Sequence, residues 1–241
     1  MAHRNPAHPL RRSALALQAA WLCLSIPASV WAAGPTGLLN DTGQTQCNSG
    51  TTYTACTPAN SGRNAPLPGQ DGRFGRDAGT PSKVGGGAAG FDFTRVCMNG
   101  SLSCQGAANT GATPSSGDWA CTLDNVTQLV WSLQSGQGEW TTYARQTLPA
   151  STNSAARCGY STGWRLPTRH ELLSIVHHGQ SSGPSIDSNY FPATQSWGYW
   201  TGDVYQPNNT MAWFVYFGGG DAYAVVTTTA SGYVRLVHNA P

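Results

Sequence analysis

Hydrophobic and polar positions divide the chain into three regions, of which the first has the pattern of a signal peptide. An uncharged apolar stretch covers residues 14–30 and follows three arginines near the N-terminus. Compact residues at Val30 and Ala32 then fit a cleavage site. A membrane anchor is the alternative, but the apolar core is short for a span and contains Pro27. We therefore expect residues 1–32 to be removed on export.

The second region, residues 33–117, is rich in small and polar residues and poor in aliphatic ones. Residues 34–119 hold 17 glycines in 86 positions. Ordering such a segment costs roughly 1–2 kcal/mol per residue, so it cannot form a large core unaided. Disulfide closure and packing onto a downstream core would offset that cost. Residues 91–96 alternate as a strand does, and the expected anchors are Phe74, Phe91, Phe93 and Val96.

The third region, residues 118–241, has the pattern of a folded domain. A β-branched run predicts a strand over 126–131, and a short helix is expected over 139–148. Thr168 as N-cap and Glu171 three residues later predict a capping box and a helix. Helix followed by hairpins indicates an α+β fold. Four short strands then predict an antiparallel meander, at 197–201, 212–217, 223–228 and 233–237.

Cysteine usage indicates an oxidising compartment. Cys23 lies in the signal peptide, which leaves an even number of cysteines in the mature chain. Six cysteines allow fifteen pairings, of which we favour sequential pairing because it closes two short loops. Zinc is disfavoured, since no CxxC spacing occurs and no histidine falls among the cysteines. We therefore predict no metal site and three disulfides, 47–56, 97–104 and 121–158, formed by Cys47, Cys56, Cys97, Cys104, Cys121 and Cys158.

Removal of the signal peptide also changes the charge. The whole chain has a net charge of +2, with 13 basic and 11 acidic residues. Three of the basic residues lie in the signal peptide, so ten remain against eleven acids, a net charge of −1. This balance disfavours nucleic acid and anionic lipid as partners. We expect a secreted, periplasmic or cell-surface protein with no stable membrane insertion.

An ordered series of motifs resembles the Lcl C-terminal domain family, named after the adhesive C-terminal domain of the Legionella collagen-like protein. The resemblance covers roughly residues 118–239. Its opening strand usually contains Thr-Gly-Leu-Val-Trp, and Gln128 here stands in place of that glycine. The matching strings are GWRLPTRHELLSIV (163–176), IDSNYFP (186–192), YWTGD (199–203), AWFVYFGGG (212–220) and YVRLV (233–237).

The RLPT string with its following glutamate is also similar to an element of the formylglycine-generating enzyme family. Both families imply a C-type-lectin-like fold, with one or two short helices and a twisted antiparallel sheet, here preceded by the Gly-rich disulfide-bonded segment. Formylglycine generation needs cysteine chemistry late in the domain, and no cysteine follows Cys158. We therefore expect that the protein is not an enzyme. We expect a structural role for this motif, which consists of Trp164, Arg165, Leu166, Pro167, Thr168 and Glu171.

The resemblance implies a non-catalytic binding module, carbohydrate-binding or adhesive at the bacterial cell surface, because the name-giving member binds sulfated polysaccharides. Aromatic faces interleaved with Asp and Asn suit neutral sugars better than a polyanion. The QPNN string (206–209) could also indicate a calcium site, but a simple β-turn explains this string better. A structural or assembly subunit of an extracellular fibre or envelope complex remains the second hypothesis, with another surface protein or a homo-oligomer as partner. The candidate ligand-binding residues are Trp200, Asp203, Tyr205, Asn208, Trp213 and Asp221.

Overall fold

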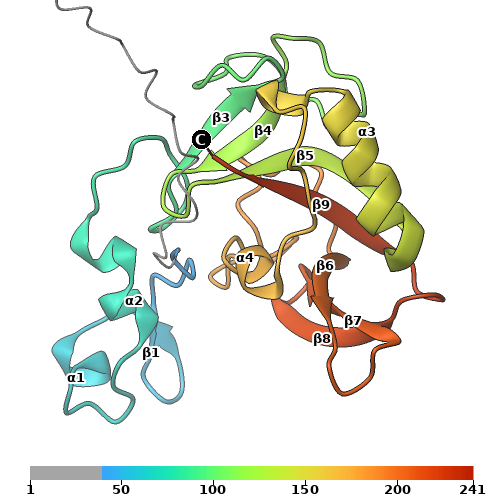
Figure 1. Cartoon of the computed structure of the whole chain (residues 1–241). Coiled ribbons are helices and arrows are strands. Elements are labelled where there is room, and N and C mark those ends of the chain that lie inside the picture. The colour runs from blue at the N-terminus through green and yellow to red at the C-terminus, as the bar shows by residue number, and fades with distance from the viewer. Residues whose placement is uncertain (1–39, 241) are drawn as a thin grey trace, which may run out of the picture. The chain divides into compact units, whose positions relative to one another are not determined.

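The structure, a computed structural model, describes residues 40–240, and its main feature is a large sheet of predominantly antiparallel strands (Figure 1). The predicted signal peptide lies outside the described residues. Among those residues the sheet has the strand order β3-β4-β5-β9-β6-β7-β8, and β1 and β2 form a separate pair. The strands are β1 (Cys47–Asn48), β2 (Tyr53–Thr54), β3 (Phe93–Cys97), β4 (Trp119–Asp124), β5 (Leu129–Gly138), β6 (Gly198–Val204), β7 (Met211–Tyr216), β8 (Asp221–Val226) and β9 (Gly232–Asn239).

The helices are short and lie between these strands. The expected helix over 139–148 is present as a π-helical segment that continues into α3, and Glu139 accepts hydrogen bonds from the backbone N–H groups of Thr142 and Tyr143 at its start. Mixed α and β structure is thereby confirmed. The helices are α1 (Pro58–Ser61), α2 (Asp71–Phe74), η1 (Arg76–Gly79), η2 (Trp140–Thr147), α3 (Leu148–Ser154), η3 (Arg157–Gly159) and α4 (Arg169–Leu173).

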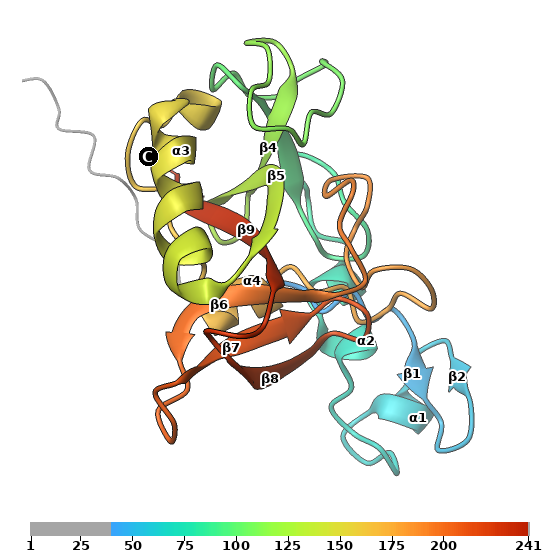
Figure 2. The same ribbon diagram turned by 90° about the vertical axis from the view of Figure 1, so that its right-hand side faces the viewer.

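Both faces of the sheet are buried at its centre, in β5 and β9, whose alternate residues point to opposite sides and pack into two cores. Val130 and Leu236 belong to a core that includes Trp140 of η2 and Leu148 of α3. Their sequence neighbours Leu129, Trp131 and Val237 belong to a second core, which includes Leu172 of α4. Figure 2 shows the η2–α3 helix running along one side of the sheet.

The last strand corrects the predicted meander. Strands β6, β7 and β8 do form antiparallel neighbours, but β9 then passes back between β5 and β6. It pairs antiparallel with β5 and parallel with β6 at Tyr199 and Tyr233. Short turns alone predicted the meander, whereas burial of the alternating residues of β9 on both faces decides its central position.

The opening strand of the third region also starts later than predicted. Residues 125–128 form a turn between β4 and β5, and β5 begins at Leu129. Gln128 occupies a left-handed conformation with φ of 58°, which favours glycine over residues with a Cβ. The residue that stands in place of the family's glycine therefore adopts the backbone conformation that glycine accommodates best.

The Gly-rich segment is attached to the sheet by its aromatic anchors. Phe91 and Phe93 are buried in the second core, and Val96 lies in the first core. Phe74 is the exception among the predicted anchors, because it lies at the end of the short α2 and is 62% exposed. The three predicted disulfides, Cys47–Cys56, Cys97–Cys104 and Cys121–Cys158, are all present.

The RLPT motif positions α4 against the sheet, as expected for a structural role. The Thr168 hydroxyl accepts from the Glu171 N–H, and a Glu171 carboxylate oxygen accepts from the Thr168 N–H, which confirms the capping box. Arg165 donates two hydrogen bonds to Glu171, at 2.8 and 2.7 Å. Burial raises the pKa of Glu171, but its hydrogen bonds and the Arg165 charge outweigh this and leave the pKa below its ordinary value. Trp164 and Leu166 are buried in the first core.

Asp124 at the end of β4 is a fully buried carboxylate. It accepts hydrogen bonds from the Val126 N–H at 2.9 Å, the Thr127 hydroxyl at 2.7 Å and the Asn40 side-chain amide at 2.6 Å. Burial raises the pKa of Asp124 to about 6 despite these bonds. Between about pH 4 and pH 6, Asp124 is therefore protonated in the folded protein and ionised in the unfolded chain.

Candidate functional site

The β6–β7 hairpin and its surroundings contain the residues that the sequence suggested as ligand contacts, and Trp200 is the clearest correction among them. Its indole is fully buried, its ring meets Phe214 edge-on with centroids 4.6 Å apart, and its Nε1–H donates to the Gly138 carbonyl at 3.0 Å. Alternation along β6 points it into the first core. Trp200 is therefore a core residue and cannot contact a ligand at the surface.

Three of the predicted residues do lie together beside α4. The Tyr205 ring meets Trp213 edge-on at 5.4 Å, and the Arg169 guanidinium lies 4.1 Å from the centroid of the Trp213 ring. The Asp203 carboxylate accepts a hydrogen bond from the Arg169 N–H at 2.6 Å. Arg169 thus lies over one face of the Trp213 ring and Asp203 holds the start of α4, so these groups contact one another while Asp203, Tyr205 and Trp213 stay partly exposed.

Asn208 and Asp221 are separated from one another. The Asn208 side-chain oxygen accepts hydrogen bonds from the backbone N–H and hydroxyl of Thr210, which is a turn at the tip of the β6–β7 hairpin. Asp221 pairs with Tyr216 at the opposite end of β7. The oxygen donors considered for calcium thus do not converge, and they do not fit a cation that needs six to eight oxygen ligands. Among residues 40–240 no group of three or more His, Cys, Asp or Glu is arranged to hold a metal ion.

A surface pocket before β6 has the composition of a ligand site. It has a volume of about 430 Å³. None of its lining residues is charged, and Trp197 is 53% exposed there. We call it the Trp197 pocket, and it is lined by Gln137, Thr194, Gln195, Ser196, Trp197 and Tyr233.

The Trp197 pocket is held in place from beneath by buried side chains. Arg235 is fully buried and donates to the Thr194 hydroxyl and the Ser132 carbonyl, each at 2.9 Å. Burial lowers the pKa of Arg235 below the ordinary value of a guanidinium. The Thr194 hydroxyl in turn donates to the Phe191 carbonyl at 2.7 Å. Both hydrogen-bonding functions of Thr194 are thus used internally, and its role is to anchor the loop.

Further contacts fix the aromatic walls of the Trp197 pocket. The Tyr199 hydroxyl accepts a hydrogen bond from the Gln195 N–H at 3.0 Å, and the Tyr233 ring stacks on Tyr199 at 5.4 Å. The Trp197 carbonyl accepts from the Phe217 N–H at 2.9 Å. These interactions hold the loop backbone while leaving the indole of Trp197 at the surface.

Sequence reasoning did not predict the Trp197 pocket because its residues come from three parts of the chain. Gln137 lies on β5 and pairs with Tyr233 on β9, and the loop 194–197 precedes β6. They meet because β9 lies between β5 and β6, which was not expected. The available signal was Trp197 itself, an aromatic residue followed by glycine among polar residues.

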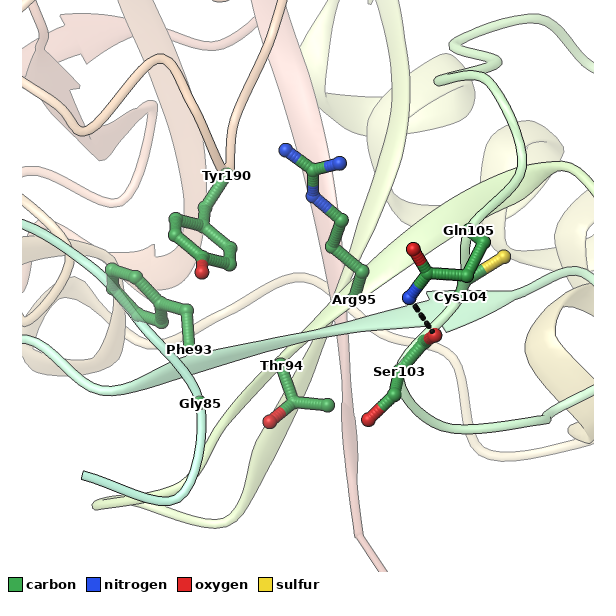
Figure 3. A pocket seen from close by; sticks show the side chains of 8 residues that line it. All are labelled: Gly85, Phe93, Thr94, Arg95, Ser103, Cys104, Gln105 and Tyr190. Carbon is green, nitrogen blue, oxygen red and sulfur yellow. Dashed lines mark hydrogen bonds between the residues drawn. The ribbon is translucent and has the colours of Figure 1, made fainter.

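A smaller pocket of about 250 Å³ lies beside the edge strand β3, and the positively charged side chain of Arg95 lines it (Figure 3). Figure 3 shows Arg95 rising between Tyr190 and Gln105. The Arg95 guanidinium lies 4.2 Å from the centroid of the Trp119 ring and donates to the Asn189 carbonyl at 3.3 Å. The charge of this pocket is therefore already engaged by the protein.

Comparison with known proteins identifies the third region of the chain. The family model of the Lcl C-terminal domain matches residues 120–238. These residues belong to the Lcl C-terminal domain family. The match covers β4 to β9 and includes all the lining residues of the Trp197 pocket. No curated protein matches the chain.

This Lcl C-terminal domain indicates an adhesin-related extracellular module, and the three disulfides are compatible with an extracellular or surface location. No helix among the described residues has both the length and the apolar character needed to cross a bilayer.

Proposed function

We propose that the protein is a secreted, non-catalytic module that binds a neutral saccharide in the Trp197 pocket and thereby acts in adhesion at the bacterial surface. The observation that carries this proposal is a half-exposed indole beside a pocket with an uncharged polar lining. Sugar rings present C–H faces that pack on aromatic rings, while their hydroxyl groups need donors and acceptors. The Trp197 pocket offers both.

The amide side chains supply the polar part of this recognition. Gln137 is exposed, and its amide makes no hydrogen bond to another described residue. The Gln195 amide N–H donates to the Ala193 carbonyl at 3.0 Å, which leaves the amide oxygen toward solvent as an acceptor. The Gln137 amide, which can donate and accept, and the Gln195 amide oxygen, which accepts, together suit two neighbouring sugar hydroxyl groups. A few polar groups in a largely preformed cavity are typical of small-molecule sites.

The chemistry of the lining also supports the non-catalytic part of the proposal. Glycoside hydrolysis uses a pair of carboxylates that flank the bond. No carboxylate or imidazole lines the Trp197 pocket. The pocket is thus suited to binding and not to proton transfer.

Charge argues for a neutral ligand over a sulfated one. The net charge of the chain after residue 32 is −1, with ten basic and eleven acidic residues. Polyanion binding draws on several accessible cations, and two of these ten basic residues, Arg169 and Arg95, already contact the rings of Trp213 and Trp119. We also propose export through the predicted signal peptide. We further propose a C-type-lectin-like fold, which the antiparallel-rich sheet supports, with the η2–α3 helix packed in one core and the short α4 in the other.

A glycan array with purified protein tests the proposal. We expect retention of one or a few neutral oligosaccharides by the wild-type protein and loss of that signal in the Trp197→Ala variant. The Trp213→Ala variant is the matched control, because it removes the same side chain from the Arg169 cluster, and it should keep the signal. Absence of any saccharide signal, or equal loss in both variants, would contradict the proposed site.

A further inference from the structure

The two edges of the large sheet are treated differently by the rest of the chain. The outer side of β3 is covered by backbone hydrogen bonds from neighbouring loops. Phe93 exchanges two with Gly86, at 2.9 and 2.6 Å. Further along β3, the Arg95 carbonyl accepts from the Cys104 N–H at 3.0 Å, and the Cys97 N–H donates to the Ser101 carbonyl at 2.9 Å. This edge is closed.

The opposite edge, β8, is open. Within the part of the chain that the structure describes, residues 222–225 have no hydrogen-bond partner outside β7. Met211 directs its carbonyl away from β8, toward the Tyr205 N–H, so its opposite residue on β8, Val226, directs its backbone groups outward. By alternation the same holds for Ala222 and Ala224. Ala222 and Ala224 therefore present unpaired N–H and C=O groups along one line, and Val226 adds its N–H, while its carbonyl accepts from the Ala230 N–H at 3.3 Å.

The sequence of β8 lacks the features that usually protect such an edge. Proteins shield edge strands with lysine, proline, a bulge or a covering segment. Strand β8 contains neither lysine nor proline, and all six of its residues pair with β7 in one regular register. Two large apolar side chains are exposed on it, Tyr223 at 44% and Val226 at 38%. The edge has the properties of a pairing surface.

We propose that β8 pairs antiparallel with β8 of a second copy of this chain, about a two-fold axis at Ala224. In this register Ala224 faces its own counterpart, and Ala222 faces Val226 of the second copy. The unpaired outward backbone groups then find partners, as in strand addition, and the Val226 carbonyl takes the Ala222 N–H of the second copy on its second lone pair, beside the Ala230 N–H. On the neighbouring face Tyr223 lies opposite Val225 of the second copy, an aromatic and β-branched pair that stabilises sheets.

Charge favours a second copy as the occupant. Asp221 is the sole charged residue of β8, and like charges directly opposite each other destabilise a strand pair. The two-fold register places Asp221 opposite Thr227 of the second copy, at the far end from the other Asp221. Self-pairing thus opposes no like charges, and it satisfies the isologous symmetry of most homodimers.

Sedimentation velocity of the full protein over a range of concentrations tests the proposal, with charged substitutions at the axis. We expect a wild-type dimer at micromolar concentration. Ala224→Lys and Ala224→Glu should each raise the dimer dissociation constant at least tenfold, because each variant places two like charges face to face. An equimolar mixture of the two variants should restore dimers, since opposite charges then meet.

Gln146→Lys and Gln146→Glu are the matched controls, because Gln146 is exposed on η2 and lies outside the proposed interface. Both should dimerise as the wild type does. Near-UV circular dichroism checks that every variant is folded. A wild-type protein that stays monomeric up to millimolar concentration would overturn the proposal. So would folded Ala224 variants that dimerise like wild type, or a mixture that remains monomeric.

Discussion

Trp197 and Trp200 stand three residues apart at the start of β6 and lie in opposite environments. Trp200 is enclosed by the first core and bonded to a backbone carbonyl, whereas more than half of Trp197 is exposed. The interior around Trp200 holds the fold together, and the Trp197 pocket presents groups to solvent. The difference teaches that an aromatic-rich segment can serve stability through a strand residue and recognition through a residue of the loop that precedes the strand.

The two regions meet at a few buried polar groups. Arg235 lies in the interior, yet its guanidinium holds Thr194 at the base of the Trp197 pocket. It forms no ion pair with any carboxylate of residues 40–240, where the ion pair found is the one between Arg165 and Glu171. The buried Arg235 charge depends instead on hydrogen bonds and aromatic rings, and removing these partners would be costly. We infer that the rigidity of the pocket depends on the interior.

The largest effect should come from truncating the interior aromatic residue. We expect Trp200→Ala to lower the free energy of unfolding by about 3–5 kcal/mol, because it leaves a cavity beside Phe214 and an unpaired Gly138 carbonyl. Trp197→Ala should change it by less than about 0.5 kcal/mol, as for most surface substitutions. Urea unfolding of both variants measures the contrast, and equal losses would contradict it.

The protonation of Asp124 should make the stability of the interior depend on pH. Its pKa is raised to about 6 in the folded protein from 3.8, so the folded state holds the proton more tightly. Stability from this group is therefore full below about pH 4 and is lost as the pH rises through 6, by at most roughly 3 kcal/mol. Urea unfolding of wild type and Asp124→Asn from pH 4 to pH 7 isolates this contribution as a difference.

Saccharide affinity should not follow this pH dependence. No carboxylate or imidazole lines the Trp197 pocket, so we expect a constant dissociation constant between pH 5 and pH 8. An affinity that changes in step with the stability would show that the pocket is not independent of Asp124.

A smaller effect is expected where the two regions are joined. Thr194→Val keeps the side-chain volume but removes the hydroxyl that accepts from Arg235. We expect a loss of roughly 1–3 kcal/mol of stability, because a buried donor is left unpaired. Saccharide affinity should fall several-fold as the loop loses its anchor. Ser196→Ala, at an exposed position of the same loop, is the control for stability. An unchanged stability in Thr194→Val would refute the anchoring role of Arg235.

The sequence predicted local features well, because local rules fix them. The capping box of Thr168 and Glu171, the two short-loop disulfides and the strand after Phe91 are determined by neighbouring residues, whereas the Cys121–Cys158 disulfide, also predicted, joins residues 37 apart. The family was also predicted from ordered motifs. The position of β9 was not, because pairing between distant strands depends on burial of both sheet faces, which a series of short turns does not reveal.

The ligand site shows the same limit. Choosing Trp197 over Trp200 as the surface residue requires knowing which of the two side chains points outward, and that depends on where β6 begins. A shift of one residue in a strand exchanges the buried and exposed faces. Gln137 and Tyr233 could not be connected to Trp197 without the parallel contact of β6 and β9.

The central claim is that the exposed indole of Trp197 binds a neutral saccharide without contributing to stability. Titration of an array-selected oligosaccharide by calorimetry, at 50 and 500 mM salt, tests it most directly. We predict that Trp197→Ala weakens binding at least tenfold, that Trp213→Ala does not, and that salt leaves the wild-type affinity unchanged because no ion pair is involved. Wild-type-like binding by Trp197→Ala, or an affinity that falls steeply with salt, would contradict the account.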